Sequence, residues 1–326
     1  MALDTGRVVD VVKQTDEAPH GGEGWVARET TMPQELGTLW AECGVTAEYG
    51  ELKSVLMRTP GPEIEAVTDP RPALWYDLLD PIRAREQHAA LVDLYRSHGV
   101  TVNLGQPVPL DKPNAYFCRD HFCMTPTGAV IARMASASRA GEERYAAADL
   151  ATLGVPIIHS VFGDATFEGA DVVVASPDLV FVGHGMRSNR AGAEQVAEAF
   201  RRVGVPEVII VEIPYGCGHI DGTINVIDRD LALVFPTQLS WVVYETMRRH
   251  GFRFLDLPSG EEAQMGMAIN MVPLAPGVVV LPACNPVTKA TLEANGVECL
   301  EVEISELMKG GGAVHCMTGV IHRAPA

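Results

Sequence analysis

One joint recurs along this chain, in which a helical segment ends at a glycine and a strand begins directly after it. It occurs five times, as His98-Gly99-Val100, Leu153-Gly154-Val155, Val203-Gly204-Val205, His250-Gly251-Phe252 and Asn295-Gly296-Val297. Successive glycines are 55, 50, 47 and 45 residues apart. Glycine ends helices because it adopts the left-handed conformation without strain. A joint repeated at such near-even spacing predicts an internal structural repeat.

Each repeat reads as strand, strand, helix and strand. Strand pairs are predicted over 116–125 with 129–133 and over 171–175 with 179–183, and the first repeat has a strand over 52–58, a helix over 81–98 and a strand over 100–104. Five such units protect their sheet edges by closing radially. We therefore expect an α/β fold that is a five-bladed, pseudo-symmetric propeller of strand-strand-helix-strand units. A doubly wound open sheet fits less well, because its strands alternate singly with helices.

The same pattern sets the domain organisation. Residues 1–44 show little periodicity and are interpreted as an N-terminal extension, whereas residues 45–326 are expected to form a single catalytic domain. Of the 326 residues, 47% are hydrophobic and 21% charged, which is typical of a globular protein with a large core.

Composition also indicates the cellular compartment and the class of binding partner. The sequence contains no run of about 18 apolar residues, so it predicts no membrane span. Residues 1–22 lack the features of a secretory signal. Seven cysteines without framework spacing favour a reducing cytoplasm. The net charge of −17 argues against nucleic acid and favours a small cationic substrate, although acidity for solubility alone also explains it. No cofactor is predicted, and a homodimer is left open.

A glycine-rich loop near the C-terminus carries the candidate nucleophile. It reads Gly310-Gly311-Gly312-Ala313-Val314-His315-Cys316-Met317-Thr318. Three glycines let the backbone turn where a side chain would clash, so a substrate can approach Cys316 closely. A reactive cysteine needs a base or a cation nearby, because the thiolate is the nucleophile. The alternative is that Cys316 is a small buried hydrophobic residue.

Further polar residues interrupt apolar runs at loops between strands. They are Arg119-Asp120, Glu168-Gly169-Ala170-Asp171, Arg187-Ser188-Asn189 and Gly218-His219-Ile220-Asp221-Gly222. Simple alternatives exist, since Asp120 can pair with Arg119 and Asn189 can cap a helix. All of them, however, occupy corresponding loops of different repeats, and convergent loops on a rigid scaffold are where sites are built. We therefore expect them to meet.

These residue types predict a specific chemistry. The acids Asp120, Glu168 and Asp221 around a cysteine would raise the pKa of its thiol unless a cation joined them. A guanidinium is such a cation, since its planar N–H donors match paired carboxylates. A histidine such as His219 can give a proton to the leaving amine and then take one from water. His219 and Asp221 are two apart, so on an extended segment they would point the same way.

The ordered motifs resemble those of the guanidino-group-modifying superfamily, which has the pentein fold and includes arginine deiminases, dimethylarginine hydrolases and amidinotransferases. The likeness runs from about residue 48 to the C-terminus, and it rests on Phe117-Cys118-Arg119-Asp120, Glu168-Gly169-Ala170-Asp171, Arg187-Ser188-Asn189, His219-Ile220-Asp221 and 310–318. The resemblance implies a five-bladed α/β propeller and a covalent amidino-cysteine intermediate.

The resemblance also implies residue roles. Cys316 would be the nucleophile, His219 the general acid and base, and Glu168 its partner. The substrate-binding residues would be Asp120 and Asp221 for the guanidinium, Arg187 for a substrate carboxylate, and Arg119 beside them. No metal is expected.

Different segments of the sequence resemble different subfamilies. The segments Glu48-Tyr49-Gly50-Glu51-Leu52-Lys53, Arg58-Thr59-Pro60-Gly61 and Glu212-Ile213-Pro214-Tyr215-Gly216 are similar to arginine deiminases, yet 104–114 leaves no room for the helical insertion usual in those enzymes. The surroundings of His219 and Cys316 are more like amidinotransferases. Asp221 argues against dimethylarginine hydrolases, which lack an acid at that position. We predict an arginine deiminase-type hydrolase, with an amidinotransferase as the alternative.

Two other protein classes are open alternatives. A zinc-dependent hydrolase would use Cys217, His219, His315 and Cys316 as ligands, although their spacing is not that of known zinc motifs. A non-catalytic ligand-binding protein of the same fold would not need the full set of nucleophile, base and acids.

Overall fold

The computed structural model describes residues 24–326, and the chain divides into two compact units, residues 1–35 and 36–326. The expectation that residues 1–22 carry no secretory signal concerns a segment outside the described residues. In the first unit, the short helix α2 (Met32–Glu35) ends at Glu35, which pairs with Arg28. The boundary at residue 44 stays a prediction.

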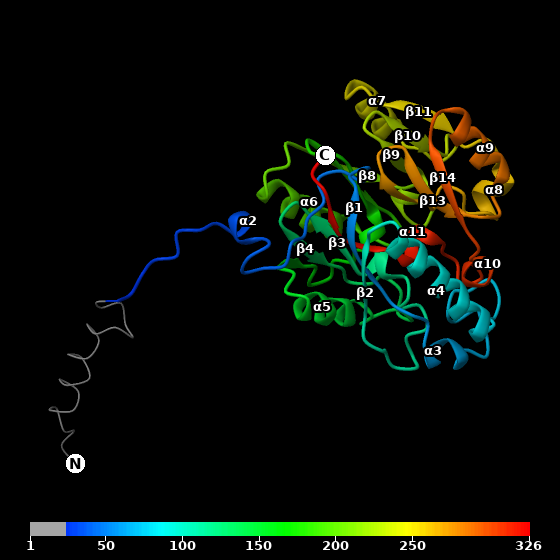
Figure 1. Cartoon of the computed structure of the whole chain (residues 1–326), viewed down its shortest axis with the longest axis horizontal. Helices are drawn as coiled ribbons and strands as arrows, with labels where there is room; N and C mark the ends of the chain where they lie inside the picture. Colours follow the sequence, from blue (N-terminus) through cyan, green and yellow to red (C-terminus); the bar gives the residue numbers. More distant parts are fainter. Residues whose placement is uncertain (1–23) are drawn as a thin grey trace, which may run out of the picture. The chain divides into compact units, whose positions relative to one another are not determined.

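The described strands form five sheets of three strands each (Figure 1). In each sheet two strands pair antiparallel and a third adds in parallel, and in four of the sheets the three strands follow one another in chain order. The sheets are β15 (Gly319–Arg323), β1 (Leu52–Met57) and β2 (Thr101–Leu104); β3 (Phe122–Thr125), β4 (Gly128–Ile131) and β5 (Ile157–Ser160); β6 (Val172–Ser176), β7 (Leu179–His184) and β8 (Glu207–Glu212); β9 (Ile224–Asp228), β10 (Leu231–Val234) and β11 (Arg253–Asp256); and β12 (Val272–Ala275), β13 (Val278–Pro282) and β14 (Glu298–Val302). The predicted strand-strand-helix-strand repeat is confirmed.

A helix connects the two parallel strands of every described sheet. These helices are α4 (Pro81–Ser97), α5 (Glu143–Thr152), α6 (Arg190–Arg202), α7 (Trp241–Arg249) and α9 (Pro286–Ala294). Each is followed by one of the predicted glycines, and all five have the left-handed backbone that stops a helix, with φ between 77° at Gly154 and 94° at Gly204. The remaining short helices are α3 (Pro62–Glu65), α8 (Gly260–Gln264), α10 (Ser305–Met308) and α11 (Val314–Met317).

The first sheet is completed from the far end of the sequence. β15 pairs antiparallel with β1, with Val320 opposite Val55, and β2 pairs in parallel with the other edge of β1. Buried Arg323 at the end of β15 donates to the carbonyls of Gly50 and Pro273. Blue β1 and the red C-terminal strand therefore lie side by side in Figure 1.

The five sheets are separate hydrogen-bonded units. Within residues 24–326, the named strands of one sheet do not pair with those of another. Their closure into a ring, as in a propeller, therefore stays a prediction.

Short 3-10 helices precede three of the strands, where the sequence predicts extended chain. They are η3 (Cys118–His121) before β3, η4 (Gly169–Asp171) before β6 and η5 (Ile220–Gly222) before β9. The predicted strand over 116–125 is therefore wrong in its first half, and His219 and Asp221 do not lie on one extended segment. Arg119, Asp120 and His121 are consecutive buried polar residues, and a 3-10 turn points them in three directions whereas a strand offers only two.

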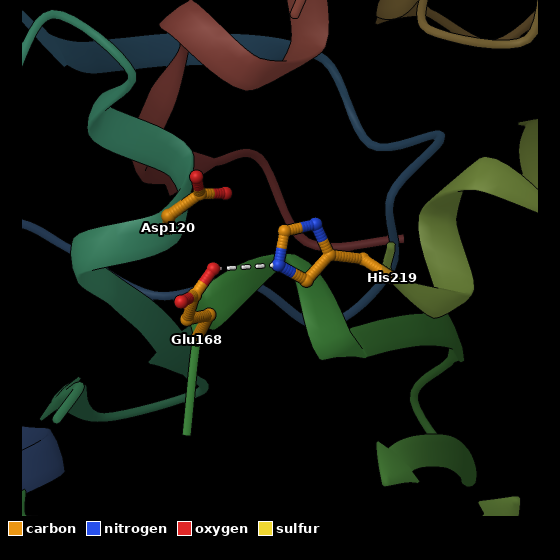
Figure 2. A group of neighbouring side chains, drawn as sticks. All are labelled: Asp120, Glu168 and His219. Atoms are coloured by element: carbon orange, nitrogen blue, oxygen red, sulfur yellow. Dashed lines mark hydrogen bonds and ion pairs between the residues drawn. The ribbon is translucent and has the colours of Figure 1, made fainter. Parts of the chain in front are cut away.

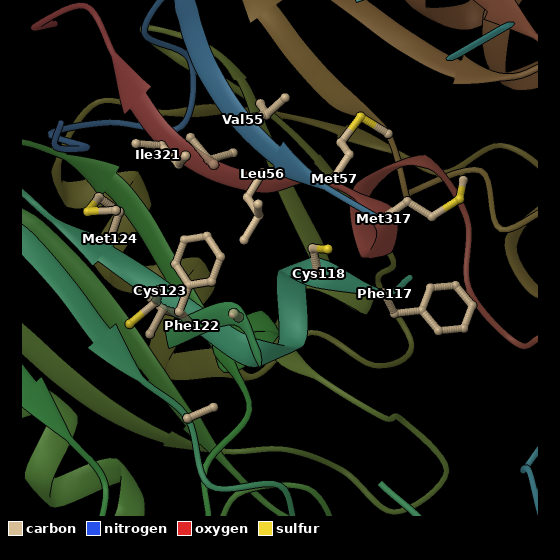
Figure 3. Close-up of a cluster of buried hydrophobic side chains, with 14 of the residues drawn as sticks. Val55, Leu56, Met57, Phe117, Cys118, Phe122, Cys123, Met124, Met317 and Ile321 are labelled. Carbon is tan, nitrogen blue, oxygen red and sulfur yellow. The ribbon is translucent and has the colours of Figure 1, made fainter. Parts of the chain in front are cut away.

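A hydrophobic core packs against η3 and α11. Leu56 and Met57 of β1, Phe122 of β3 and Met317 of α11 are fully or almost fully buried in one cluster. Figure 3 shows Phe117 and Phe122 on either side of η3, with residues of β1 and the C-terminal segment packed opposite. The segments that carry Asp120 and Cys316 therefore share one rigid support.

Candidate active site

The glycine-rich loop has the conformation that its sequence predicts. A Cβ atom on Gly310 would lie 1.9 Å from the hydroxyl oxygen of Tyr116, and Gly311 has a φ of 89°. Both positions therefore require glycine. The loop leads into α11, where Cys316 is partly buried.

One pocket gathers four of the predicted site residues. It is lined by Cys316, His219, Asp120 and Arg187, together with Ala73, Leu74, Asn114, Phe117, Arg139, Gly218 and the glycines 310–312. Cys316, His219, Asp120 and Arg187 belong to the repeats of four different sheets, and all lie outside the strands, so the expected convergence of loops is observed.

His219 is held by one buried acid, and a second buried acid binds the backbone next to it. Its Nε2 donates to Oε2 of Glu168 at 2.8 Å (Figure 2). Asp171 accepts from the N–H of Ile220, the next residue, at 3.1 Å and from the hydroxyl of Ser188. Burial alone would lower the pKa of His219, but Asp171, Asp120 and Glu168 together raise it, and the same contact lowers the pKa of Glu168 against its burial. At neutral pH the pair is an imidazolium beside a carboxylate.

Asp120 presents a carboxylate to the pocket and shares it with a residue that the sequence reasoning missed. Its Oδ2 accepts from Nη1 of Arg139 at 2.5 Å, and its Oδ1 is buried without a hydrogen-bond partner among the described residues. Arg139 also pairs with Glu142 at 2.9 Å and lies 3.8 Å from Glu168. The free Oδ1 leaves Asp120 able to accept from a bound cation.

Arg187 also lines the pocket and contacts one of its acids. Its Nη1 donates to Oε2 of Glu168 at 3.1 Å, and its side chain is 22% exposed. Asn189, two residues on, caps α6 by accepting from the Gly192 N–H at 2.9 Å. Capping of the helix is therefore enough to explain the asparagine at position 189.

Asp221 does not line the pocket and instead contacts His315 and Arg119. Its Oδ2 accepts from Nδ1 of His315 at 2.9 Å and lies 3.7 Å from Nε of Arg119. Burial would raise the pKa of Asp221, but His315 and Arg119 lower it. Arg119 also donates to Glu48 at 3.3 Å and to the carbonyl of Val172 at 2.7 Å. The described residues that line the pocket include neither Asp221 nor Arg119, so their contact with a substrate stays a prediction.

A second residue absent from the sequence-based set contacts the thiol directly. Nδ2 of Asn270 donates to Sγ of Cys316 at 2.9 Å. Asn270 lies in the loop before β12, in an apolar stretch with no recognisable motif. Its position at the start of a repeat, equivalent to that of the other site residues, is the one signal that could have found it.

Burial and then the carboxylates of Asp120 and Asp221 raise the pKa of Cys316 to about 12. The thiol is therefore protonated in the ligand-free protein at neutral pH. A bound guanidinium would reverse this, because a cation between the thiol and the acids favours the thiolate.

The polar residues also contain a possible metal-binding arrangement, although not the predicted one. Among residues 24–326, one set of three acid, histidine or cysteine side chains has its ligand atoms within 4.8 Å of one another, namely Asp120, Glu168 and His219 (Figure 2). Cys217 instead donates to the carbonyl of His219, so the predicted zinc ligands do not converge. Arg139 and Arg187 contact the two carboxylates, which disfavours a further cation that brings no donors of its own.

Sequence comparisons identify related families. A family model described as N,N dimethylarginine dimethylhydrolase, eukaryotic, matches residues 80–323. An uncharacterized protein of Aeropyrum pernix is 30% identical over 237 residues, covering 72% of this chain and 83% of that protein. An arginine deiminase of Rhodococcus erythropolis is 27% identical over 248 residues, covering 65% of this chain and 61% of that enzyme.

Structure comparisons identify the same fold in two kinds of enzyme. Dimethylarginine dimethylaminohydrolase from Pseudomonas aeruginosa, complexed with citrulline, has a TM-score of 0.68 and 22% identity, covering 83% of this chain and 99% of that chain. SxtG, an amidinotransferase from Microseira wollei, has a TM-score of 0.68 and 16% identity, covering 87% of this chain and 98% of that chain. Relatives and structural neighbours thus include guanidino hydrolases and amidinotransferases. None of the helices in the described residues is long and apolar enough to span a membrane.

Proposed function

Because the chain belongs to the N,N dimethylarginine dimethylhydrolase family of guanidino-group-modifying enzymes, we propose that it hydrolyses arginine to citrulline and ammonia through an amidino adduct on Cys316. The observation that carries the proposal is the pocket itself. A thiol, an imidazolium and a carboxylate with a free oxygen face one space, and each comes from a different segment. This is the set that cleavage of a C–N bond in a guanidinium requires.

The geometry supports a two-step mechanism. The guanidinium binds against Asp120, and its charge lets Cys316 lose its proton to solvent. The resulting thiolate attacks the central carbon and forms an S–C bond. His219, held as an acid by Glu168, gives its proton to the departing nitrogen, and the C–N bond breaks to release ammonia. The neutral His219 then takes a proton from water, whose oxygen attacks the same carbon. The S–C bond breaks as the remaining hydroxyl proton leaves to solvent, so that the ureido product forms and the thiolate returns.

The proposal of arginine as the substrate rests on features other than the catalytic residues. Asp221 stands where dimethylarginine hydrolases lack an acid, although the matching family model carries the name of that branch. We therefore place unmethylated arginine first, in line with the arginine deiminases among the relatives. The alternative is an amidinotransferase, favoured by the sequence around His219 and Cys316 and by the likeness to an amidinotransferase fold. The same His219 could activate an acceptor amine in place of water.

Product analysis separates these two reactions. Incubation with arginine as sole substrate should yield citrulline and ammonia in equal amounts at a steady rate. Parallel incubations would add glycine or lysine as acceptors, and methylated arginines or guanidinoacetate as other donors. If product forms only when an amine is added, with ornithine released in step, the transferase replaces the hydrolase.

Arg187 is expected to bind a carboxylate of the substrate. Agmatine is arginine without that carboxylate, so the wild-type enzyme should have a higher kcat/KM for arginine than for agmatine, and Arg187→Ala should lose about tenfold or more of kcat/KM for arginine but little for agmatine. Arg190→Ala is the matched control, since exposed Arg190 pairs only with Glu194 on its own helix among the contacts of the described chain. Equal use of arginine and agmatine by the wild type would refute the role of Arg187.

A further inference from the structure

The site residues occupy equivalent places in the repeats, and one such place holds a residue without an assigned role. Asp120 directly precedes the strand pair that begins with β3, and Glu168, His219 and Cys316 stand in the same way before β6, β9 and β15. The corresponding loop of the remaining sheet, before β12, carries Asn270. Asn270 is 9% exposed, and its side chain reaches the nucleophile.

The orientation of the Asn270 carboxamide follows from its partners. Its Oδ1 accepts from the backbone N–H groups of His315, at 2.8 Å, and Cys316, at 3.2 Å. Because both partners are donors, the atom facing them must be the carbonyl oxygen. The NH₂ group is therefore the one that faces the Cys316 sulfur, 2.9 Å away.

A second asparagine fixes the backbone on both sides of this contact. Nδ2 of Asn225, 1% exposed on β9, donates to the carbonyls of Ile269 at 3.0 Å and Met271 at 2.7 Å. These two carbonyls flank Asn270. The carboxamide is thus held from behind by the strand that follows His219 and Asp221, and it cannot turn away from the thiol without breaking several buried hydrogen bonds.

We infer that Asn270 is a further catalytic residue, which donates an N–H to the Cys316 sulfur and stabilises the thiolate both before attack and when it leaves. The inference rests on the proposed role of Cys316 as nucleophile. A hydrogen bond to a charged acceptor is stronger than one to a neutral acceptor, so the contact favours the thiolate over the thiol. Asn270 also aligns α11, because its oxygen binds the N–H of the nucleophile itself.

Alkylation of Cys316 by iodoacetamide tests this without a substrate. The rate would be followed by mass spectrometry of the peptide that contains Cys316, which separates it from exposed Cys284. Loss of the donor should lower the thiolate population about tenfold or more, and since a more basic thiolate is also more nucleophilic, the net rate should fall roughly threefold to tenfold. Two variants are compared: Asn270→Ala removes donor and acceptor, whereas Asn270→Asp keeps the acceptor for the backbone and removes the donor.

Both variants should slow the alkylation of Cys316 and lower kcat more than they change KM, while Asn270→Asp keeps a melting temperature near that of the wild type. Asn103→Asp, a half-buried change in β2, should leave the alkylation rate unchanged. Fast alkylation in Asn270→Asp with slow alkylation in Asn270→Ala would reduce Asn270 to a structural clamp and overturn the inference. If alkylation is slow in Asn270→Asp but normal in Asn270→Ala, the added negative charge is the cause, and the inference is likewise overturned. If arginine is not turned over but both variants slow alkylation, the assigned substrate fails and Asn270 keeps its role.

Discussion

Replacing Cys316 with alanine is expected to remove essentially all turnover of guanidino substrates while leaving the fold intact. The proposed reaction forms an S–C bond, and no other cysteine or serine lines the described pocket beside the acids and His219. We expect kcat to fall by roughly 10⁴-fold or more, as for other removed nucleophiles. Loss of one partly buried sulfur should change the free energy of unfolding by only about 1 kcal/mol.

The control for this change is Cys284→Ala, which removes an exposed free cysteine outside the pocket and should leave activity unchanged. Circular dichroism would verify that both variants fold. A second readout is the intact mass of a slowed variant, His219→Ala, which during turnover should gain the mass of arginine less ammonia. The proposed reaction releases ammonia and leaves the rest of the substrate on the sulfur, whereas a gain of one amidino group alone would indicate the transferase. Substantial activity of Cys316→Ala would end the covalent mechanism altogether.

Asp120→Asn is expected to have the second-largest effect, lowering kcat/KM for arginine by roughly 100-fold or more. The substitution removes the carboxylate that the substrate cation would meet and leaves Arg139 with one acid fewer. Breaking a buried ion pair by removing one partner costs about 3 kcal/mol or more, and the loss falls on binding and chemistry together. Asp221→Asn should also weaken both, but through its contacts with His315 and Arg119 as well as through any contact with substrate.

The two aspartates are measured side by side with Asp230→Asn as the control. Asp230 forms an exposed pair with Arg253, so its replacement adds the same charge change without touching the site. Steady-state kinetics with arginine give kcat and KM for each variant. Wild-type values for Asp120→Asn would place Asp120 outside the site.

The repeat could be predicted because its signal is local. A glycine that must adopt positive φ at the end of a helix is visible in one sequence, and all five did so in the structure. The resemblance to guanidino-group-modifying enzymes is likewise confirmed by the family match. The order of the motifs and the symmetry of the repeats were therefore enough to predict where the pocket lies.

Arg139 and Asn270 were missed because their contacts with the site are not visible in the local sequence. Arg139 lies in a polar stretch that reads as the solvated start of a helix, and Asn270 lies in an apolar one. Arg139 meets Asp120 across 19 residues of its own repeat, and Asn270 meets Cys316 of another repeat, 46 residues away. The 3-10 turns were missed for a related reason, since the run around Arg119 and Asp120 is apolar enough to suggest a strand. Only the different directions of their buried partners require a turn there.

The pairing of β15 with β1 also determines when the enzyme acquires its chemistry. α11, with Cys316, ends just before β15, so the nucleophile takes its place only once that strand docks on β1. Translation delivers β1 long before its partner, and closing so long a loop is entropically costly and slow. A half-made chain consequently carries acids and a histidine but no positioned sulfur. Under the proposed mechanism, the thiol therefore becomes reactive toward guanidines only in molecules that have finished folding.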